Sequence, residues 1–98
     1  MENEILNQYP KKVKLRWRWD GENNDYITYQ NPQTGAICIL NPVGASIFNY
    51  SDGSITVDEI ITKMMEEYDV PSRDYLKNDV ISFITEFSKM GIIMLLSD

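Results

Sequence analysis

The sequence contains no histidine, a single cysteine and no long apolar run. Histidine is the usual general base and a common zinc ligand, so its absence argues against histidine-based triads and most zinc sites. The single cysteine, Cys38, excludes an internal disulfide, which is typical of a reducing compartment. Because no cation adjoins Cys38, we expect a buried structural thiol rather than a nucleophile. The sequence therefore predicts no catalytic residue, no metal ligand and no cofactor, so an enzyme is not expected.

Composition also argues against membrane and nucleic-acid partners. The first ten residues, MENEILNQYP, lack the basic and apolar regions of a signal peptide, and the apolar run IIMLL is too short to cross a bilayer. With 15 acidic and 9 basic residues, the chain has a formal charge of −6. An acidic protein repels phosphate backbones and anionic lipid surfaces. We therefore expect a cytoplasmic protein that binds neither.

Positive charge is concentrated near the N-terminus, where five of the 9 basic residues occur within eight positions: Lys11, Lys12, Lys14, Arg16 and Arg18. Charged residues along an edge strand commonly protect a sheet against aggregation. A docking patch for an acidic partner is the alternative. The sequence leaves both interpretations open.

Three strands are predicted in the first half of the chain. Residues 13–19 alternate apolar and basic side chains, which is the period-2 pattern of a strand with one wet face. Residues 25–30 and 36–40 are rich in β-branched and aromatic residues, and NPQTG supplies a tight turn between them. These segments predict an antiparallel meander. Residues 1–11 show no periodicity and are expected to form a flexible arm, which leaves residues 12–98 as the folded domain.

Three helices are predicted in the second half. Asn41 and Pro42 are a favourable N-cap and first residue, and Thr56 and Glu59 have capping-box spacing. Ser72 is the expected cap of a third helix, which Gly91 ends. The run IIMLL then forms either a last short strand or a packed tail. Strands followed by helices indicate an α+β fold, here a winged-helix-like arrangement of an N-terminal three-stranded antiparallel sheet and three helices.

Residues 40–60, LNPVGASIFNYSDGSITVDEI, resemble the signature of the PqqD family, and the resemblance extends over roughly residues 12–96. The positions that carry it are Leu40, Gly44, Ile47, Asp52-Gly53, Thr56-Val57, Glu59-Ile60, Tyr68-Asp69-Val70, Asp79-Val80, Phe83, Phe87 and Gly91-Ile92-Ile93. The resemblance implies a domain that binds the leader region of a ribosomally synthesised precursor peptide. It implies presentation of that peptide to a modifying enzyme, most typically a radical SAM/SPASM protein.

A binding site can be predicted on physical grounds. The strand at 36–40 carries neither charge nor proline, so its edge is open to β-strand addition by an extended peptide. Ile81 falls beside the core stripe of the third helix, which indicates a groove wall facing that strand, with Lys77 placed to pair with a leader carboxylate. A wider buried helix face is the alternative. The predicted peptide-binding residues are Ala36, Ile37, Cys38, Ile39, Lys77, Ile81, Ile84 and Ser88.

Two other functions compete with this hypothesis. A winged-helix nucleic-acid-binding protein needs a basic recognition helix, whereas the third helix balances three basic against three acidic residues. A general protein–protein adaptor would bind no leader at all. Pairing between the open edges of two copies would give a homodimer.

Overall fold

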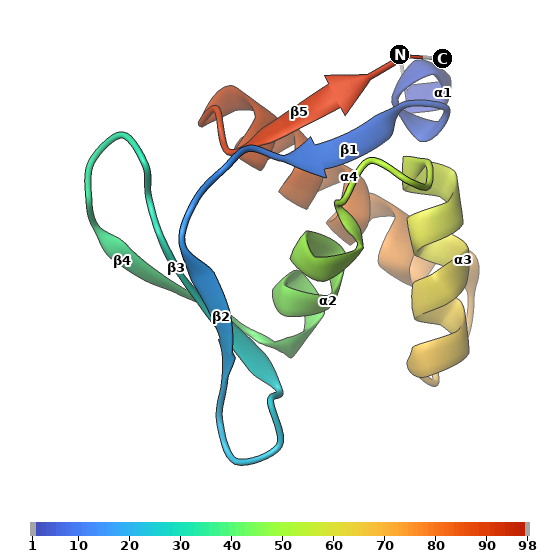
Figure 1. The fold of residues 1–98 in the computed structure, drawn as a ribbon. Coiled ribbons are helices and arrows are strands. Elements are labelled where there is room, and N and C mark those ends of the chain that lie inside the picture. Colours follow the sequence, from blue (N-terminus) through green and yellow to red (C-terminus); the bar gives the residue numbers. More distant parts are fainter. Residues whose placement is uncertain (1, 98) are drawn as a thin grey trace.

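The computed structural model describes residues 2–97, so Met1 of the predicted arm and Asp98 of the predicted domain lie outside the described residues. The α+β class is confirmed (Figure 1). No helix within residues 2–97 combines the length and the apolar character needed to span a bilayer. In chain order the elements are α1 (Glu2–Leu6), β1 (Tyr9–Lys12), β2 (Trp17–Asp20), β3 (Tyr26–Gln30), β4 (Ile37–Leu40), α2 (Pro42–Tyr50), α3 (Val57–Glu67), α4 (Arg73–Lys89) and β5 (Ile93–Leu96).

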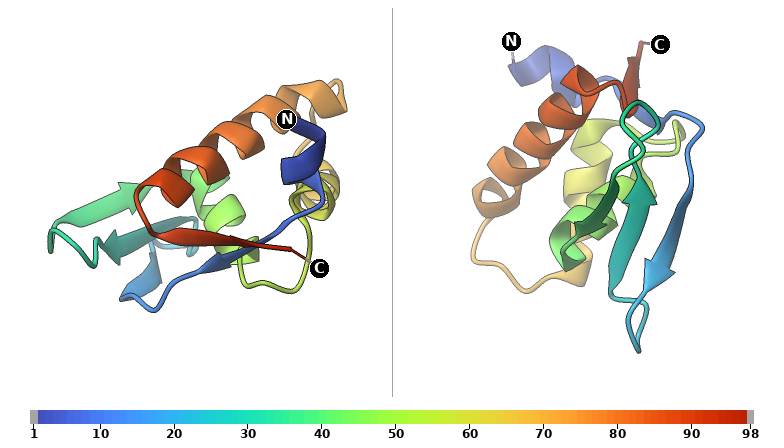
Figure 2. Two further views of the ribbon diagram at one scale, coloured as in Figure 1. Left: turned by 90° about the horizontal axis from the view of Figure 1, so that it is seen from above. Right: turned by 90° about the vertical axis from the view of Figure 1, so that its left-hand side faces the viewer.

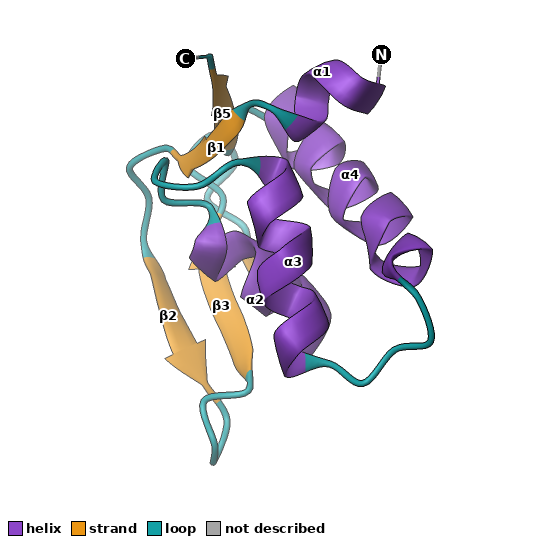
Figure 3. Cartoon of the chain, turned by 90° about the vertical axis from the view of Figure 1, so that its right-hand side faces the viewer, coloured by secondary structure: helices purple, strands orange, loops and turns teal. Residues whose placement is uncertain are grey.

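The described strands form two antiparallel sheets, β2-β3-β4 and β1-β5. The predicted three strands and three helices are present as β2 to β4 and α2 to α4, and α1, β1 and β5 are added to them. One face of the three-stranded sheet is covered by helices (Figure 3). Phe48 of α2 is fully buried there and packs against Trp17 and Tyr29, with ring centroids 5.6 and 5.7 Å apart. The other face of this sheet carries no helix (Figure 2).

Residues 2–12 contain a helix and a strand, whereas the sequence predicted a flexible arm over residues 1–11. Glu2–Leu6 is helical, and β1 pairs with β5 from Tyr9↔Leu96 to Lys12↔Ile93. Pro10 is buried in this arrangement. Four residues are too few to show a clear period-2 pattern, and the partner strand lies at the other end of the sequence, so local reasoning does not detect the pairing. The pairing also identifies IIMLL as a strand.

The first predicted strand is also shorter than expected. Alternation extends over residues 13–19, but β2 begins at Trp17, and residues 13–16 connect β1 to β2. Val13 N–H donates to Ile92 O at 2.9 Å, so the start of this connection continues along β5 rather than along β3. Side-chain alternation shows which residues face the core, but it does not show which neighbouring strand accepts the backbone hydrogen bonds.

Lys12 connects β1 to the C-terminal end of α2. Its ammonium group donates to Phe48 O at 2.8 Å, Ser51 O at 3.0 Å and Asn49 O at 3.3 Å, where helix carbonyls lack intrahelical partners. Burial lowers the pKa of Lys12 from its ordinary value, although the Asp52 carboxylate opposes that shift. One of the five clustered basic residues therefore has a structural role.

The predicted caps of α2 and α3 are confirmed. The Asn41 side chain accepts from Gly44 N–H at 2.8 Å, and Pro42 is the first residue of α2. At α3, Thr56 Oγ1 accepts from Glu59 N–H at 3.1 Å while Glu59 Oε1 accepts from Thr56 N–H at 2.9 Å. Both bonds of the capping box are therefore formed.

Removal of the α3 cap should lower stability measurably. We expect Thr56→Ala to reduce the free energy of unfolding by about 1 kcal/mol, because Glu59 N–H loses its acceptor. Urea unfolding followed by circular dichroism measures the change. Lys63→Ala, at an exposed position of the same helix, should stay within about 0.5 kcal/mol of the parent. Equal losses in the two variants would contradict the cap assignment.

The ends of α4 differ in how they are capped. Ser72 is the N-cap as predicted, but its side chain makes no capping hydrogen bond. At the other end Gly91 has φ +74, its N–H donates to Ser88 O at 3.1 Å, and Ile92 N–H donates to Phe87 O at 2.9 Å. These are the two bonds of a Schellman motif, and they turn the chain from α4 into β5.

A contact between Tyr50 and Glu67 links α2 to α3 and makes the stability of the fold sensitive to alkaline pH. The Tyr50 hydroxyl donates to Glu67. Burial, and secondarily this hydrogen bond, raises the pKa of Tyr50 from its ordinary value near 10 to about 12. Between these values the folded state holds a proton that the unfolded state has lost, so stability decreases as pH rises from about 10 to about 12.

Tyr50→Phe should therefore flatten the alkaline decrease in stability. Tyr29, whose pKa burial also raises to about 12, remains in the variant, so the slope should diminish without vanishing. Urea unfolding repeated across this pH range measures the slope. Tyr75→Phe, at a residue that is 64% exposed, removes a tyrosine hydroxyl outside this contact and serves as the matched control. If Tyr50→Phe left the pH dependence of the free energy of unfolding unchanged, the Tyr50–Glu67 contact would not be the cause of the alkaline decrease.

Candidate functional site

Strand β4 has an open edge. In the strand order β2-β3-β4, β4 pairs with β3 on one side, and no described strand pairs with its other side. The N-terminal segment pairs with β5 instead, and therefore leaves this edge uncovered. The free edge of β4 is on the side of the sheet nearer α4 (Figure 2).

The backbone groups on this edge belong to Ile37 and Ile39. Asn31 N–H donates to Ala36 O at 2.8 Å, and the register continues with Gln30↔Ile37, Tyr29↔Cys38 and Thr28↔Ile39. Hydrogen-bonded and non-hydrogen-bonded pairs alternate along an antiparallel ladder. The N–H and C=O groups of Ile37 and Ile39 therefore point away from β3, to where a further strand would add.

The side chains of β4 alternate between the core and solvent. Leu40 is buried, and Cys38 is half-buried against the core beside Tyr29. Ile37 and Ile39 are 67% and 69% exposed on the opposite face. Two exposed isoleucines on an unpaired edge are an unusual surface for an isolated domain, because nothing in the strand discourages pairing with another chain. Ala36 is exposed in the preceding turn.

A groove of about 480 Å³ adjoins this edge and is called here the β4–α4 groove. Its walls come from β4, from the first turns of α2 and from one flank of α4. Phe83 of α4 stacks on Phe87 with ring centroids 4.1 Å apart, which fixes the aromatic wall. The lining residues are Ile39, Leu40, Asn41, Val43, Gly44, Ile47, Asp79, Ser82 and Phe83.

Gly44 sets the depth of the groove. A Cβ at this position would lie 3.1 Å from Phe83 Cε2 and 3.3 Å from Asn41 Oδ1, so a side chain here would require these two neighbours to shift by a few tenths of an ångström. Substitution here would displace the ring that forms the wall of the groove.

The exposed flank of α4 beside the groove is anionic. Asp79 and Ser82 line the groove, and helical spacing places Tyr75 and Glu86 on the same flank. Asp79 and Glu86 are both exposed, and the side chain of Tyr75 is 64% exposed. This rim can accept hydrogen bonds from a basic side chain and offers an aromatic surface next to it.

The α4 residues predicted from the sequence occupy a different place. Ile81 and Ser88 line a second groove of about 420 Å³ between α4, α1 and β5, together with Ile5 and Leu95. Helical spacing puts Lys77 on this flank, one turn before Ile81. Ile84 is fully buried in the core. These four residues therefore do not form the wall that faces β4, and the structure corrects that part of the predicted geometry.

Sequence reasoning did not identify Asp79, Ser82 and Phe83 as groove residues. A helical wheel shows two flanks beside the core stripe, and only the tertiary arrangement shows which flank faces β4. Asp79 and Ser82 are polar, so apolar periodicity does not indicate them, and Phe83 has the spacing of a core residue. Phe83 does pack against both core clusters as well.

Together these observations define a class of protein: a small α+β domain with an unpaired strand edge beside a groove lined by both apolar and polar residues. Residues 29–93 match the family described as coenzyme PQQ synthesis protein D (PqqD). The chain belongs to the PqqD family. This confirms the resemblance based on residues 40–60.

The fold is also similar to a solved structure, described as TbiB1 in complex with the TbiA(beta) leader peptide. The TM-score is 0.70 at 20% sequence identity, over 90% of this chain and 99% of that chain. No curated protein matches the sequence. The likeness at this level of identity establishes the shared fold.

Proposed function

We propose that this chain is a non-catalytic recognition protein that holds the leader region of a ribosomally synthesised precursor peptide and presents it to a modifying enzyme. The observation that carries the proposal is the unpaired β4 edge beside the β4–α4 groove. An extended peptide would add to this edge as a fourth strand, bonding to the backbone of Ile37 and Ile39. Membership of the PqqD family supports this function, as does the leader peptide bound to the structural neighbour.

Recognition of the peptide would depend on two kinds of contact, backbone hydrogen bonds and side-chain contacts in the groove. Backbone hydrogen bonds along β4 fix the direction and register of the peptide without reading its sequence. Alternate side chains of the added strand would enter the β4–α4 groove, where Val43 and Phe83 favour an apolar residue and Asp79 favours a neighbouring lysine or arginine. We therefore place the helix contacts on Asp79, Ser82 and Phe83.

The contact area is small, so the affinity should be moderate. A peptide that pairs with a four-residue strand and fills one groove is expected to bind with a micromolar to sub-micromolar Kd, about −8 to −9 kcal/mol. Such an affinity suits a protein that must release its peptide. A radical SAM/SPASM protein is the modifying enzyme that we propose, on the basis of the family resemblance alone.

Peptide selection followed by NMR tests the proposal. A displayed library of random peptides is selected on the chain, and an enriched peptide is titrated into the isotope-labelled protein. We expect the largest amide shifts at residues 37–40 and at Asp79, Ser82 and Phe83. Shifts confined to Ile81, Ser88 and Leu95 would place the site in the second groove and refute the β4 assignment. A match between the selected motif and a short precursor encoded beside this gene would identify the leader.

A further inference from the structure

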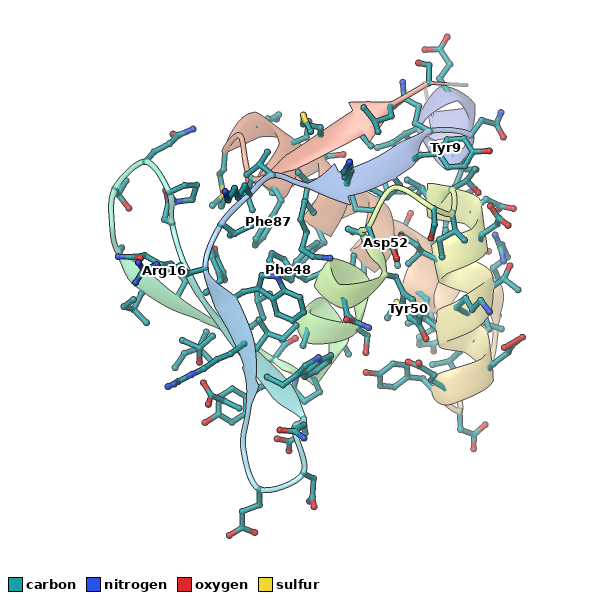
Figure 4. All side chains as sticks on the ribbon, in the orientation of Figure 1. Tyr9, Arg16, Phe48, Tyr50, Asp52 and Phe87 are labelled. Carbon is teal, nitrogen blue, oxygen red and sulfur yellow. The ribbon has the colours of Figure 1, made fainter. Side chains whose placement is uncertain are left out.

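The outer face of the three-stranded sheet combines exposed cations with the two exposed isoleucines. Alternation along the strands puts Arg16 and Arg18 on the same face as Ile37 and Ile39, opposite the face that α2 covers. A hollow of about 470 Å³ lies on this face at one end of the sheet, and it is lined in part by Arg16, Arg18 and Ile37. The Arg16 side chain points away from the helices, across the sheet (Figure 4).

The outer face of the three-stranded sheet is positively charged, whereas the chain as a whole is negatively charged. The chain has a net charge of −6, yet Lys14, Arg16 and Arg18 are all exposed. Arg18 pairs with Asp20 at 3.1 Å, and among the side chains described, residues 4–97, no carboxylate forms an ion pair with Arg16. A guanidinium without an anionic partner, next to an apolar surface, is a strong site for a carboxylate.

Protection of the β2 edge explains this arrangement less well. Charges that only blunt an edge strand need to extend along that edge into solvent. Arg16 and Arg18 instead share a hollow with Ile37, which belongs to β4, two strands away. Ile37 thus belongs both to the hollow and to the edge at which a peptide would add.

The geometry of strand addition determines which peptide residues would reach the hollow. Side chains of an added strand alternate between the β4–α4 groove and the outer face. A residue on the outer face beside Ile37 would lie three strand spacings of about 4.8 Å from the backbone of β2. A glutamate side chain of the peptide that extends over the outer face towards β2, together with the Arg16 side chain that extends towards β4, can bridge this distance.

We propose that the hollow between Arg16, Arg18 and Ile37 binds an acidic side chain of the same peptide that pairs with β4. This inference rests on the proposed function and adds the chemistry of its ligand. The recognised peptide carries apolar or basic side chains toward the groove and a glutamate or aspartate toward the outer face. Charge would then set the register of the added strand, which backbone pairing alone leaves free to slip.

A charge exchange tests the proposal. The probe is a fluorescent peptide selected from the random library on the parent chain, with an analogue in which its outer-face glutamate is replaced by lysine. We expect Arg16→Glu combined with Arg18→Glu to weaken the binding of the glutamate peptide by about fivefold or more. The lysine analogue should bind this double variant with most of the lost affinity restored. Lys63→Glu combined with Lys89→Glu changes the net charge equally at exposed positions of α3 and α4 that do not line the hollow, and should change affinity by less than about twofold.

The outcomes separate this inference from the proposed function. The hollow is not a carboxylate site if the selected peptides depend on β4 for binding but show no enriched acidic position. The same conclusion follows if the double glutamate variant does not bind the lysine analogue more tightly than the glutamate peptide. If the parent selects no β4-dependent peptide, the proposed function itself fails. Thermal unfolding checks that the variants are folded. Arg16→Gln with Arg18→Gln provides a milder pair, which should give an intermediate loss for the glutamate peptide and none for the lysine analogue.

Discussion

Ile39→Pro should weaken the binding of a β4-dependent peptide by about tenfold to a hundredfold while the domain stays folded. Proline removes the Ile39 N–H, one of the groups on the free edge, and leaves a peptide carbonyl without its donor. A polar group left unpaired in this way costs about 1–3 kcal/mol, which corresponds to the expected loss. Fluorescence anisotropy with a selected peptide measures the affinity.

The position is chosen so that folding and binding separate. The hydrogen bonds from β4 to β3 belong to Cys38 and Leu40, and proline at Ile39 leaves them intact. Ile39→Thr keeps the N–H and the β-branch, and should lose no more than about threefold in affinity. Equal losses in the two variants would mean that the side chain, and not the backbone edge, carries the interaction. Thermal unfolding of both proteins establishes that they are folded.

The local parts of this fold follow from the sequence because their causes are local. Asn41, Thr56 and Glu59 satisfy helix N–H groups within their own turn, so a short sequence window contains all the partners. Gly91 similarly ends α4 within the few residues of its Schellman motif. The β3–β4 hairpin is also local, since Gly35 takes φ +78 in a turn fixed by Asn31. Each was predictable from residues a few positions apart.

The parts that the sequence did not predict depend on pairings between distant segments. Strand β1 is defined by its pairing with β5, more than 80 positions later, and Tyr9↔Leu96 has no local signature. The same limit applies to the candidate site. The open β4 edge was predictable from the absence of charge and proline in AICIL, whereas the flank of α4 that faces it depends on how the helix packs on the sheet. Hydrophobic periodicity shows which face of a helix packs on the core, but it does not show what lies beside each of the two flanks of that face.

Ser82→Trp should weaken peptide binding by at least about tenfold, because it fills the β4–α4 groove with a large side chain. Ser82 is exposed and lines that groove, so the indole has room without disturbing the core. A peptide side chain that is excluded from the groove forfeits the burial of about one apolar residue, 1.5–3 kcal/mol. Titration calorimetry with the selected peptide gives the affinity, and circular dichroism establishes that α4 is retained.

Thr85→Trp provides the matched control, with the same new side chain three residues along the same helix. Thr85 lines the second groove with Ile81 and Ser88, on the flank that faces α1 and β5. Binding should remain within about twofold of the parent, since this flank is remote from the proposed peptide. The opposite result, a loss in Thr85→Trp with Ser82→Trp unaffected, would move the site to the flank first predicted from the sequence. A comparable loss in both would indicate that the peptide contacts α4 on both flanks, which strand addition at β4 does not allow.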